Sequence, residues 1–243
     1  MYNKFSDTYD KFIGIDYPKW ILYIESIWAE FDVSPHLVLD LGCGTGNFTI
    51  PLSDKGYDMI GVDSSAEMLS QAQSKADGKD ILFLLQDMRE LELYGTVDAC
   101  ICMVDAINYI LKEDELLSVF RLVYNYLNSA GLFVFDINTE YKFRHVLGEN
   151  SFCDISDNDA IIWENYYDGN SRINEYLVNI FTSVENGLYE RYEEVHTQRA
   201  YEVNEVSKKL IEAGFELLGA YGGFTFEAPK EDSEKIFFVA RKN

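Results

Sequence analysis

Closely spaced glycines and acids recur where short apolar runs end, and residues of these types can bind a nucleoside-bearing cofactor. The run 37–41 contains Asp40 and is followed by glycines at 42, 44 and 46. Glycine adopts positive φ and lacks a Cβ, so the backbone of such a loop can approach a ligand closely. Two further acids, Asp63 and Asp87, follow later apolar runs. One glycine loop is a weak signal, but the series predicts a cofactor site at one edge of a parallel sheet.

The glycine spacing disfavours a dinucleotide as the cofactor. The dinucleotide fingerprint is G-x-G-x-x-G, whereas here the third glycine, Gly46, follows Gly44 after a single residue. Asp40 would also repel a pyrophosphate and would suit a cation or an ammonium group. The charge therefore argues against an NAD-dependent oxidoreductase and favours a cofactor with a positively charged amino-acid end.

The sequence Asp40-Leu41-Gly42-Cys43-Gly44-Thr45-Gly46 resembles motif I of the class I S-adenosylmethionine-dependent methyltransferases. The resemblance continues through 61–69, 86–89 and 210–215 and covers most of the chain outside 139–200. Asp87-Met88-Arg89 and Tyr9-Asp10 are similar to the branch that contains glycine N-methyltransferase and the amino-sugar N,N-dimethyltransferases. The resemblance implies an enzyme that uses S-adenosylmethionine.

The resemblance also implies roles for single residues. The glycine loop would pass beneath the methionine part of the cofactor, Asp63 would accept hydrogen bonds from both ribose hydroxyls, and Asp87 would accept one from the adenine amino group. The alternatives are that Asp63 pairs with the backbone at Ser64, that Asp87 is a surface acid and that Met68 is a core residue. The cofactor-binding residues expected in this way are Trp20, Asp40, Gly42, Cys43, Gly44, Asn47, Asp63, Ser64, Met68, Asp87, Met88 and Met103.

Tyr9 and Asp105 are the candidates for the reacting centre. Asp105 and the nearby Asn108 could face a substrate amine or could cap the following turn. Tyr9 belongs to an aromatic stripe at helical spacing, which is also typical of ordinary packing. His196 could act as a base or lie at the surface, and the three histidines share no metal-ligand spacing, so we expect no metal.

The order of predicted elements indicates an α/β fold with a doubly wound, seven-stranded and mostly parallel sheet. The hydrophobic pattern predicts an antiparallel hairpin at one edge, because only about a dozen residues join the last two strands. Pro51 should bend the helix that follows the first strand or delay its start. The predicted helices are 2–12, 18–31, one ending near 55, 65–76, 113–127 and 202–213, and the predicted strands are 37–41, 58–62, 81–85, 97–103, 132–137, 215–221 and 235–240.

Residues 139–200 interrupt this order with extended segments and turn signals, which predict an inserted antiparallel β-meander. We therefore expect a methyltransferase domain formed by 1–138 and 201–243, with 1–31 as a helical cover. The insertion would be a substrate or lid subdomain. Its meander could instead form a dimer interface, so both a monomer and a homodimer are open.

Charge and composition narrow the choice of partner. Forty-two acids against 20 bases give a net charge of −22, which argues against nucleic acid and anionic membranes. The cysteines lack metal-site spacing, the first twelve residues lack a signal-peptide core, and we expect a cytoplasmic protein with reduced thiols. The hypothesis is in-line transfer of a methyl group to a small-molecule acceptor, an amine by preference. The alternatives are transfer to a protein side chain and a non-catalytic module that binds S-adenosylmethionine or S-adenosylhomocysteine.

Overall fold

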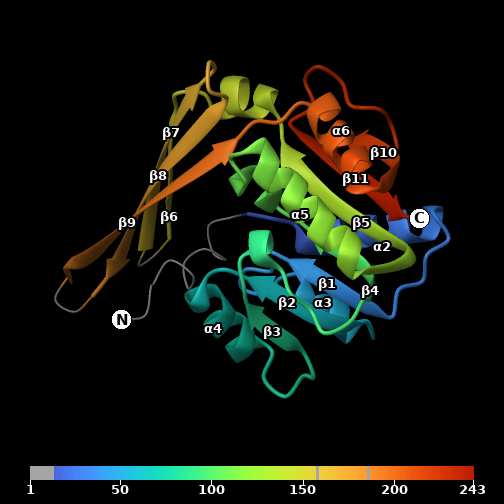
Figure 1. Cartoon of the computed structure of the whole chain (residues 1–243). Coiled ribbons are helices and arrows are strands. Elements are labelled where there is room, and N and C mark those ends of the chain that lie inside the picture. Colours follow the sequence, from blue (N-terminus) through green and yellow to red (C-terminus); the bar gives the residue numbers. More distant parts are fainter. Residues whose placement is uncertain (1–13, 157–158, 185–186) are drawn as a thin grey trace.

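A computed structural model describes residues 14–156, 159–184 and 187–243, which fold around two β-sheets (Figure 1). Sheet A consists of β1 (Leu37–Leu41), β2 (Asp58–Asp63), β3 (Leu82–Leu85), β4 (Val97–Cys102), β5 (Leu127–Asn138), β10 (Phe215–Gly222) and β11 (Lys235–Lys242). Sheet B consists of β6 (Ser151–Ile155), β7 (Asp159–Asp168), β8 (Ile173–Ser183) and β9 (Tyr189–Arg199). The helices are α2 (Tyr17–Glu30), α3 (Thr49–Asp54), α4 (Ala66–Lys75), α5 (Glu113–Tyr126) and α6 (Val203–Ala213), with short turns η1 (Met88–Glu90), η2 (Ala106–Tyr109) and η3 (Lys142–Leu147).

The strand order of sheet A is β10-β11-β5-β4-β1-β2-β3. Strands β1 to β5 pair in parallel, and β11 pairs antiparallel with both β5 and β10. This confirms the predicted α/β fold and the hairpin at one edge. The antiparallel strand β11 lies second from the edge, so its first residue, Lys235, sits opposite Asn138 at the carboxyl end of β5. The helix predicted over 2–12, with Tyr9, lies outside the described residues.

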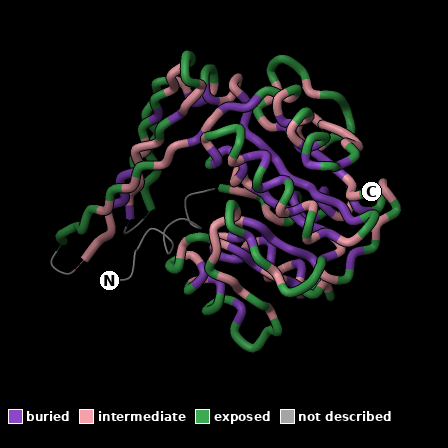
Figure 2. Tube along the Cα trace, viewed as in Figure 1, coloured by how far each residue is buried: buried purple, intermediate pink, exposed green. Residues whose placement is uncertain are grey.

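Helices cover both faces of sheet A, because its strands are apolar on both sides. One face packs on α5 and α6, and the other packs on α2 and α3. The first face holds a group of rings in which Phe133 and Phe135 stack at 4.7 Å and Phe135 and Phe238 stack at 5.1 Å between centroids. Each fully buried ring of this kind stabilises the fold by about 1.5–3 kcal/mol. Figure 2 shows the buried residues concentrated in sheet A and its helices.

Local signals set where the helices begin. Helix α2 begins after Asp16, whose carboxylate accepts a hydrogen bond from the backbone of Lys19, and α3 begins only at Thr49, as Pro51 predicted. Helix α4 is capped by Ser65, whose hydroxyl accepts from Met68 N at 3.2 Å. Ser64-Ser65-Ala66-Glu67 has capping-box spacing with Ser64 in the cap position, but the cap is the next residue, Ser65. Ser64 lines the cavity described below.

Sheet B is an antiparallel meander within 151–199, inside the predicted insertion. Its strands alternate between a face turned toward the carboxyl edge of sheet A and an outer face. Trp163 sits opposite Val178, and Tyr176 sits opposite His196, all four on the inner face. Sheet B therefore forms a wall that faces the carboxyl edge of sheet A.

Candidate functional site

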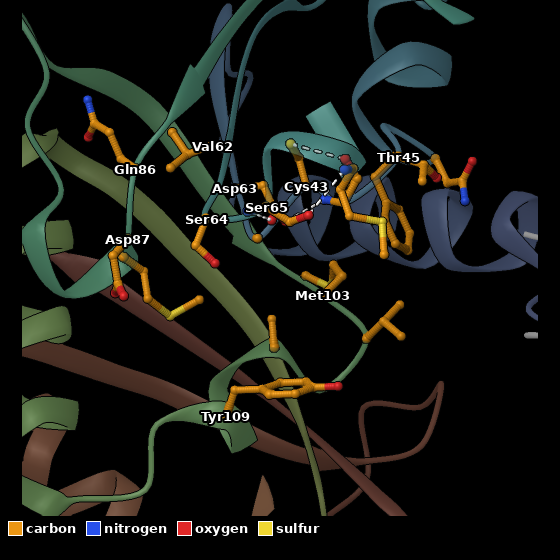
Figure 3. A pocket seen from close by; sticks show the side chains of 18 of the residues that line it. Cys43, Thr45, Val62, Asp63, Ser64, Ser65, Gln86, Asp87, Met103 and Tyr109 are labelled. Carbon is orange, nitrogen blue, oxygen red and sulfur yellow. Dashed lines mark hydrogen bonds between the residues drawn. The ribbon is translucent and has the colours of Figure 1, made fainter. Parts of the chain in front are cut away.

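A cavity of about 370 Å³ opens at the carboxyl edge of sheet A, where β1, β2, β3 and β4 end. We call it the first cavity. Figure 3 shows Asp63, Ser64, Asp87, Met103 and Tyr109 around it, on segments that follow β2, β3 and β4. The carboxyl edge of a doubly wound sheet is where ligands bind in such folds.

The glycine loop forms the floor of the first cavity. Gly42 and Gly44 have φ of +78° and +54°, a conformation that side chains disfavour. The backbone of Gly42 donates to Val62 O at 2.7 Å, which fixes the loop against β2. A Cβ added at Gly44 would meet no atom within 4 Å, and Gly44 lines the cavity, so the backbone here borders open space. This open backbone cradle fits a ligand held by close approach, as the sequence predicts for S-adenosylmethionine.

Asp63, the last residue of β2, is the acid at the centre of the first cavity. One carboxylate oxygen accepts from Gly44 N and the other from Ser65 N, each at 2.8 Å. Burial raises the pKa of Asp63, although the backbone hydrogen bonds from Ser65, Gly44 and Ser64 oppose the rise. Each carboxylate oxygen keeps a further lone pair, so two neighbouring hydroxyl groups can be accepted at once.

Asp87 caps the short turn η1 at the far end of the first cavity. Its carboxylate forms an ion pair with Arg89, with 2.9 Å between Oδ1 and Nε and 2.5 Å between Oδ2 and Nη2. The hydrogen bonds from Arg89 hold the pKa of Asp87 below its usual value. An ionised carboxylate fixed in this way can accept from a ligand amino group. The remaining residues of the predicted set that line this cavity are Cys43, Asn47, Ser64, Met68, Met88 and Met103.

Two residues predicted to bind the cofactor lie elsewhere. Asp40 is 1% exposed beneath the loop, where its carboxylate accepts from the hydroxyl of Thr49 at 2.5 Å. It points to α3 and does not line the first cavity. Trp20 packs among Phe48, Phe224 and Phe237 and lines a second cavity instead.

The second cavity, of about 560 Å³, lies between the carboxyl edge of sheet A, the start of α2 and the inner face of sheet B. Aromatic rings form much of its wall: Trp20, Tyr109, Phe152, Trp163, Tyr176 and Phe224. Three residues, Val104, Tyr109 and His196, line both cavities. The two spaces therefore adjoin, so molecules bound in them would meet at these three residues.

Asp105 lies in the wall of the second cavity, and two side chains hold its carboxylate. It accepts from Gln198 Nε2 at 2.7 Å and pairs with Lys235 Nζ at 3.3 Å, and Lys235 also pairs with the buried Asp136. Burial opposes ionisation, but Lys235 and Lys142 outweigh it and hold the pKa of Asp105 below its usual value. Its φ of +52° follows one of +58° at Val104, an arrangement that is strained for a β-branched residue.

Sequence patterns do not reveal Tyr109, Gln198 or Lys235, which lie where the two cavities meet or in the wall around Asp105. Gln198 and Lys235 contact Asp105 from 93 and 130 positions away in the chain. Asn108 is buried: its side-chain amide donates hydrogen bonds to the carbonyls of Asn138 and Arg199, and its Oδ1 accepts one from Asn138 N. It therefore links η2 to β5 and β9 and lines neither cavity. No short-range pattern could reveal these contacts, since they depend on how sheet B returns to sheet A.

Within 14–156, 159–184 and 187–243, no three His, Cys, Asp or Glu side chains gather closely enough to hold a metal ion. No helix in the same ranges is long and apolar enough to cross a membrane.

Comparison with known proteins agrees with this geometry. Residues 38–131 match a family model described as a methyltransferase domain. The chain is 34% identical to a protein of Geobacillus sp. (strain WCH70) that is described as a methyltransferase, over 99% of both chains. It is 24% identical to a glycine/sarcosine N-methyltransferase of Halorhodospira halochloris, over 83% of this chain and 73% of that one.

The fold also matches that of a solved methyltransferase structure. An S-adenosylmethionine-dependent methyltransferase from Clostridium acetobutylicum is 33% identical and superposes with a TM-score of 0.89, over 99% of this chain and 98% of that one. The resemblance read from motif I and the expected cofactor are thus confirmed. The chain belongs to the S-adenosylmethionine-dependent methyltransferases.

Proposed function

We propose that this methyltransferase transfers the methyl group to the nitrogen of a small amine bound in the second cavity. The observation that carries the proposal is the shared wall of the two cavities at Val104, Tyr109 and His196. A cavity of about 560 Å³ is within the range that small-molecule ligands occupy. The likeness to a glycine/sarcosine N-methyltransferase supports an amine as the acceptor.

In this proposal the first cavity holds S-adenosylmethionine, which supplies a methyl group on a positively charged sulfur. The loop Gly42–Gly46 approaches the amino-acid end of the cofactor, and Asp63 accepts hydrogen bonds from the ribose hydroxyls. Asp87 accepts from the adenine amino group, and Met88 covers the ring. Met68 and Met103 add apolar contacts along the same cavity.

The second cavity orients the amine and excludes water. The ionised carboxylate of Asp105 accepts an N–H of the acceptor, while Lys235 and Gln198 keep that carboxylate in place. Trp163 and Tyr176 wall the space on the side of sheet B, and Trp20 lies over Lys235 with 5.1 Å between the ammonium and the ring centroid. Holding the nitrogen in line with the methyl group accounts for much of the rate in such reactions.

Calorimetric titration with S-adenosylhomocysteine tests the cofactor site. We expect Asp63→Ala to weaken binding by at least about 30-fold, because it removes charge-assisted hydrogen bonds worth about 1.5–3 kcal/mol each. The matched control is Asp58→Ala, which removes an exposed acid at the other end of β2. Equal affinity in both variants would refute the placement of the ribose.

The acceptor is tested by following S-adenosylhomocysteine formation from S-adenosylmethionine with glycine, sarcosine, glucosamine and putrescine. Turnover of one of them supports N-methylation. Asp105→Asn should then lower kcat while the affinity for S-adenosylhomocysteine stays within about twofold, since Asn tolerates positive φ but removes the charge. Tight cofactor binding with no turnover of any of the four amines would contradict an amine acceptor.

A further inference from the structure

We propose that His196 is the general base of the transfer, oriented by Glu194 and coupled to the acceptor through the hydroxyl of Tyr109. This inference rests on the proposed amine methylation and identifies where the released proton goes. An amine that becomes methylated loses a proton, and the mechanism above gives that proton no destination.

The position of these side chains is the first argument. Tyr109 and His196 line both the cavity that fits the cofactor and the cavity proposed for the acceptor. Tyr109 stands on η2, directly after β4, and His196 stands on β9 of sheet B. Two elements that are far apart in the sequence thus bring a phenol and an imidazole to the one place where the two bound molecules would meet.

Two distances around the His196 ring support the same role: a hydrogen bond to Tyr109 and a close approach of the Glu194 carboxylate. Tyr109 Oη lies 3.3 Å from His196 Nδ1, and His196 Nε2 lies 3.3 Å from Glu194 Oε2. Glu194 and His196 are two positions apart on β9 and therefore share a face. A carboxylate at Nε2 favours the tautomer with its proton on Nε2, which leaves the Nδ1 lone pair turned toward the phenol. A base oriented by a third group is the arrangement that general-base catalysis uses.

Asp105, the other candidate base, already has hydrogen-bond and ion-pair partners in the protein. Its carboxylate accepts a hydrogen bond from Gln198 and pairs with Lys235, and the positive charges of Lys235 and Lys142 hold its pKa below the usual value. A carboxylate whose pKa is held low is a weak proton acceptor, whereas an imidazole titrates in the physiological range. Asp105 therefore orients the amine, and His196 takes its proton.

Methyl transfer and proton release involve the acceptor nitrogen, Tyr109 and His196. The acceptor nitrogen forms a bond to the methyl carbon and becomes positively charged, and the electron pair of the broken carbon–sulfur bond stays on sulfur. The nitrogen then gives a proton to Tyr109 Oη as the phenol proton moves to His196 Nδ1. Burial and the neighbouring Asp105 raise the pKa of Tyr109, so the phenol keeps a proton before and after the step. The imidazolium that forms is stabilised by Glu194.

Nuclear magnetic resonance of the full chain bound to S-adenosylhomocysteine, with no acceptor present, tests which ring nitrogen of His196 carries the proton. We expect the Nε2–H tautomer at about pH 8, and a lower titration midpoint for His196 in Glu194→Gln, because the carboxylate stabilises the imidazolium. Glu194→Gln leaves every other titratable group that lines the second cavity unchanged: Asp16, Lys19, Asp105, Tyr109, Lys142, Cys153, Asp154, Tyr176 and Lys235. The control is Glu212→Gln on α6, which makes the same change of charge away from both cavities. An Nδ1–H tautomer, or equal shifts in both variants, would overturn the proposal.

Turnover of whichever of the four amines reacts fastest gives the second readout. His196→Gln should lower kcat by about 100-fold at about pH 8 and leave the affinity for S-adenosylhomocysteine unchanged. Glu194→Gln should move the acid limb of the pH–rate profile to lower pH, whereas His145→Gln, an exposed histidine of η3, should match the wild type. Normal turnover by His196→Gln would refute the proton role alone, while a wild-type chain that fails to bind S-adenosylhomocysteine would refute the proposed function. If the chain binds S-adenosylhomocysteine and none of the four amines reacts, the amine acceptor is contradicted and the proton role of His196 is refuted with it.

Discussion

Two acids that look equivalent in the sequence have different surroundings in the structure. Asp63 ends β2 and faces the first cavity, whereas Asp40 lies one residue before the end of β1 and is buried against Thr49. Burial raises the pKa of Asp40 to about 7, and the hydrogen bond from Thr49 only partly opposes the rise. The type of residue was visible in the sequence, but the face of the strand to which it points depends on where α3 packs.

This difference predicts how stability depends on pH. The folded-state pKa of Asp40 lies above the unfolded value of 3.8, so its contribution is complete below about pH 4 and is lost as the pH rises through about 7. The loss is on the order of 4 kcal/mol at most, at about 1.4 kcal/mol per pH unit. Asp40→Asn keeps an acceptor for Thr49 and removes the titration. Thermal melts should therefore show that Asp40→Asn gains stability relative to the wild type between about pH 5 and pH 8. A difference that stays constant across this range would contradict the assignment.

At the scale of elements, the sequence predicted what short-range patterns encode. Apolar periodicity located α2, α5 and α6 to within one or two residues, and Gly214 ends α6 with φ of +108°. The pattern could not show that β11 brings Lys235 to Asp105 and Asp136, or that β9 returns His196 to Tyr109. These contacts follow from strand order and register, which sequence spacing does not determine.

The glycine loop gives a prediction with a matched control. Gly44 and Gly78 have φ of +54° and +76°, and an added Cβ would meet nothing within 4 Å at either position. Alanine at either site should therefore cost a similar amount, about 1–2 kcal/mol, in the free energy of unfolding. Only Gly44→Ala should weaken S-adenosylhomocysteine binding, by about tenfold or more in calorimetry, because its Cβ enters the first cavity. If both variants bind as the wild type does, the loop does not approach the cofactor.

At the scale of the whole molecule, the chain carries a net charge of −22, whereas the second cavity is lined by aspartate and lysine side chains in equal number. Lys19, Lys142 and Lys235 line that cavity beside Asp16, Asp105 and Asp154, so its wall is balanced although the chain is strongly acidic. Such a wall suits a small acceptor that is neutral overall better than a polyanion. The excess acids lie elsewhere and repel one another.

This repulsion should be measurable as an effect of salt. Raising NaCl from about 20 to about 200 mM shortens the screening length, so the melting temperature at about pH 8 should rise. The same series at about pH 5 should show a smaller rise, because some carboxylates are then protonated. A flat or falling melting temperature at about pH 8 would mean that the surface ion pairs outweigh the repulsion between the excess acids.

The antiparallel course of β11 has a consequence for the order in which the site is completed during synthesis. Asp136 emerges from the ribosome 99 residues before Lys235, the cation that neutralises it. Until β11 adds to the sheet, a buried carboxylate on β5 has no counter-charge, which disfavours closing the sheet around it in ionised form. The parallel strands can pair earlier, but the wall of the second cavity around Asp105 becomes stable only when the last strand docks. Catalytic competence should therefore arrive late and abruptly as the nascent chain lengthens.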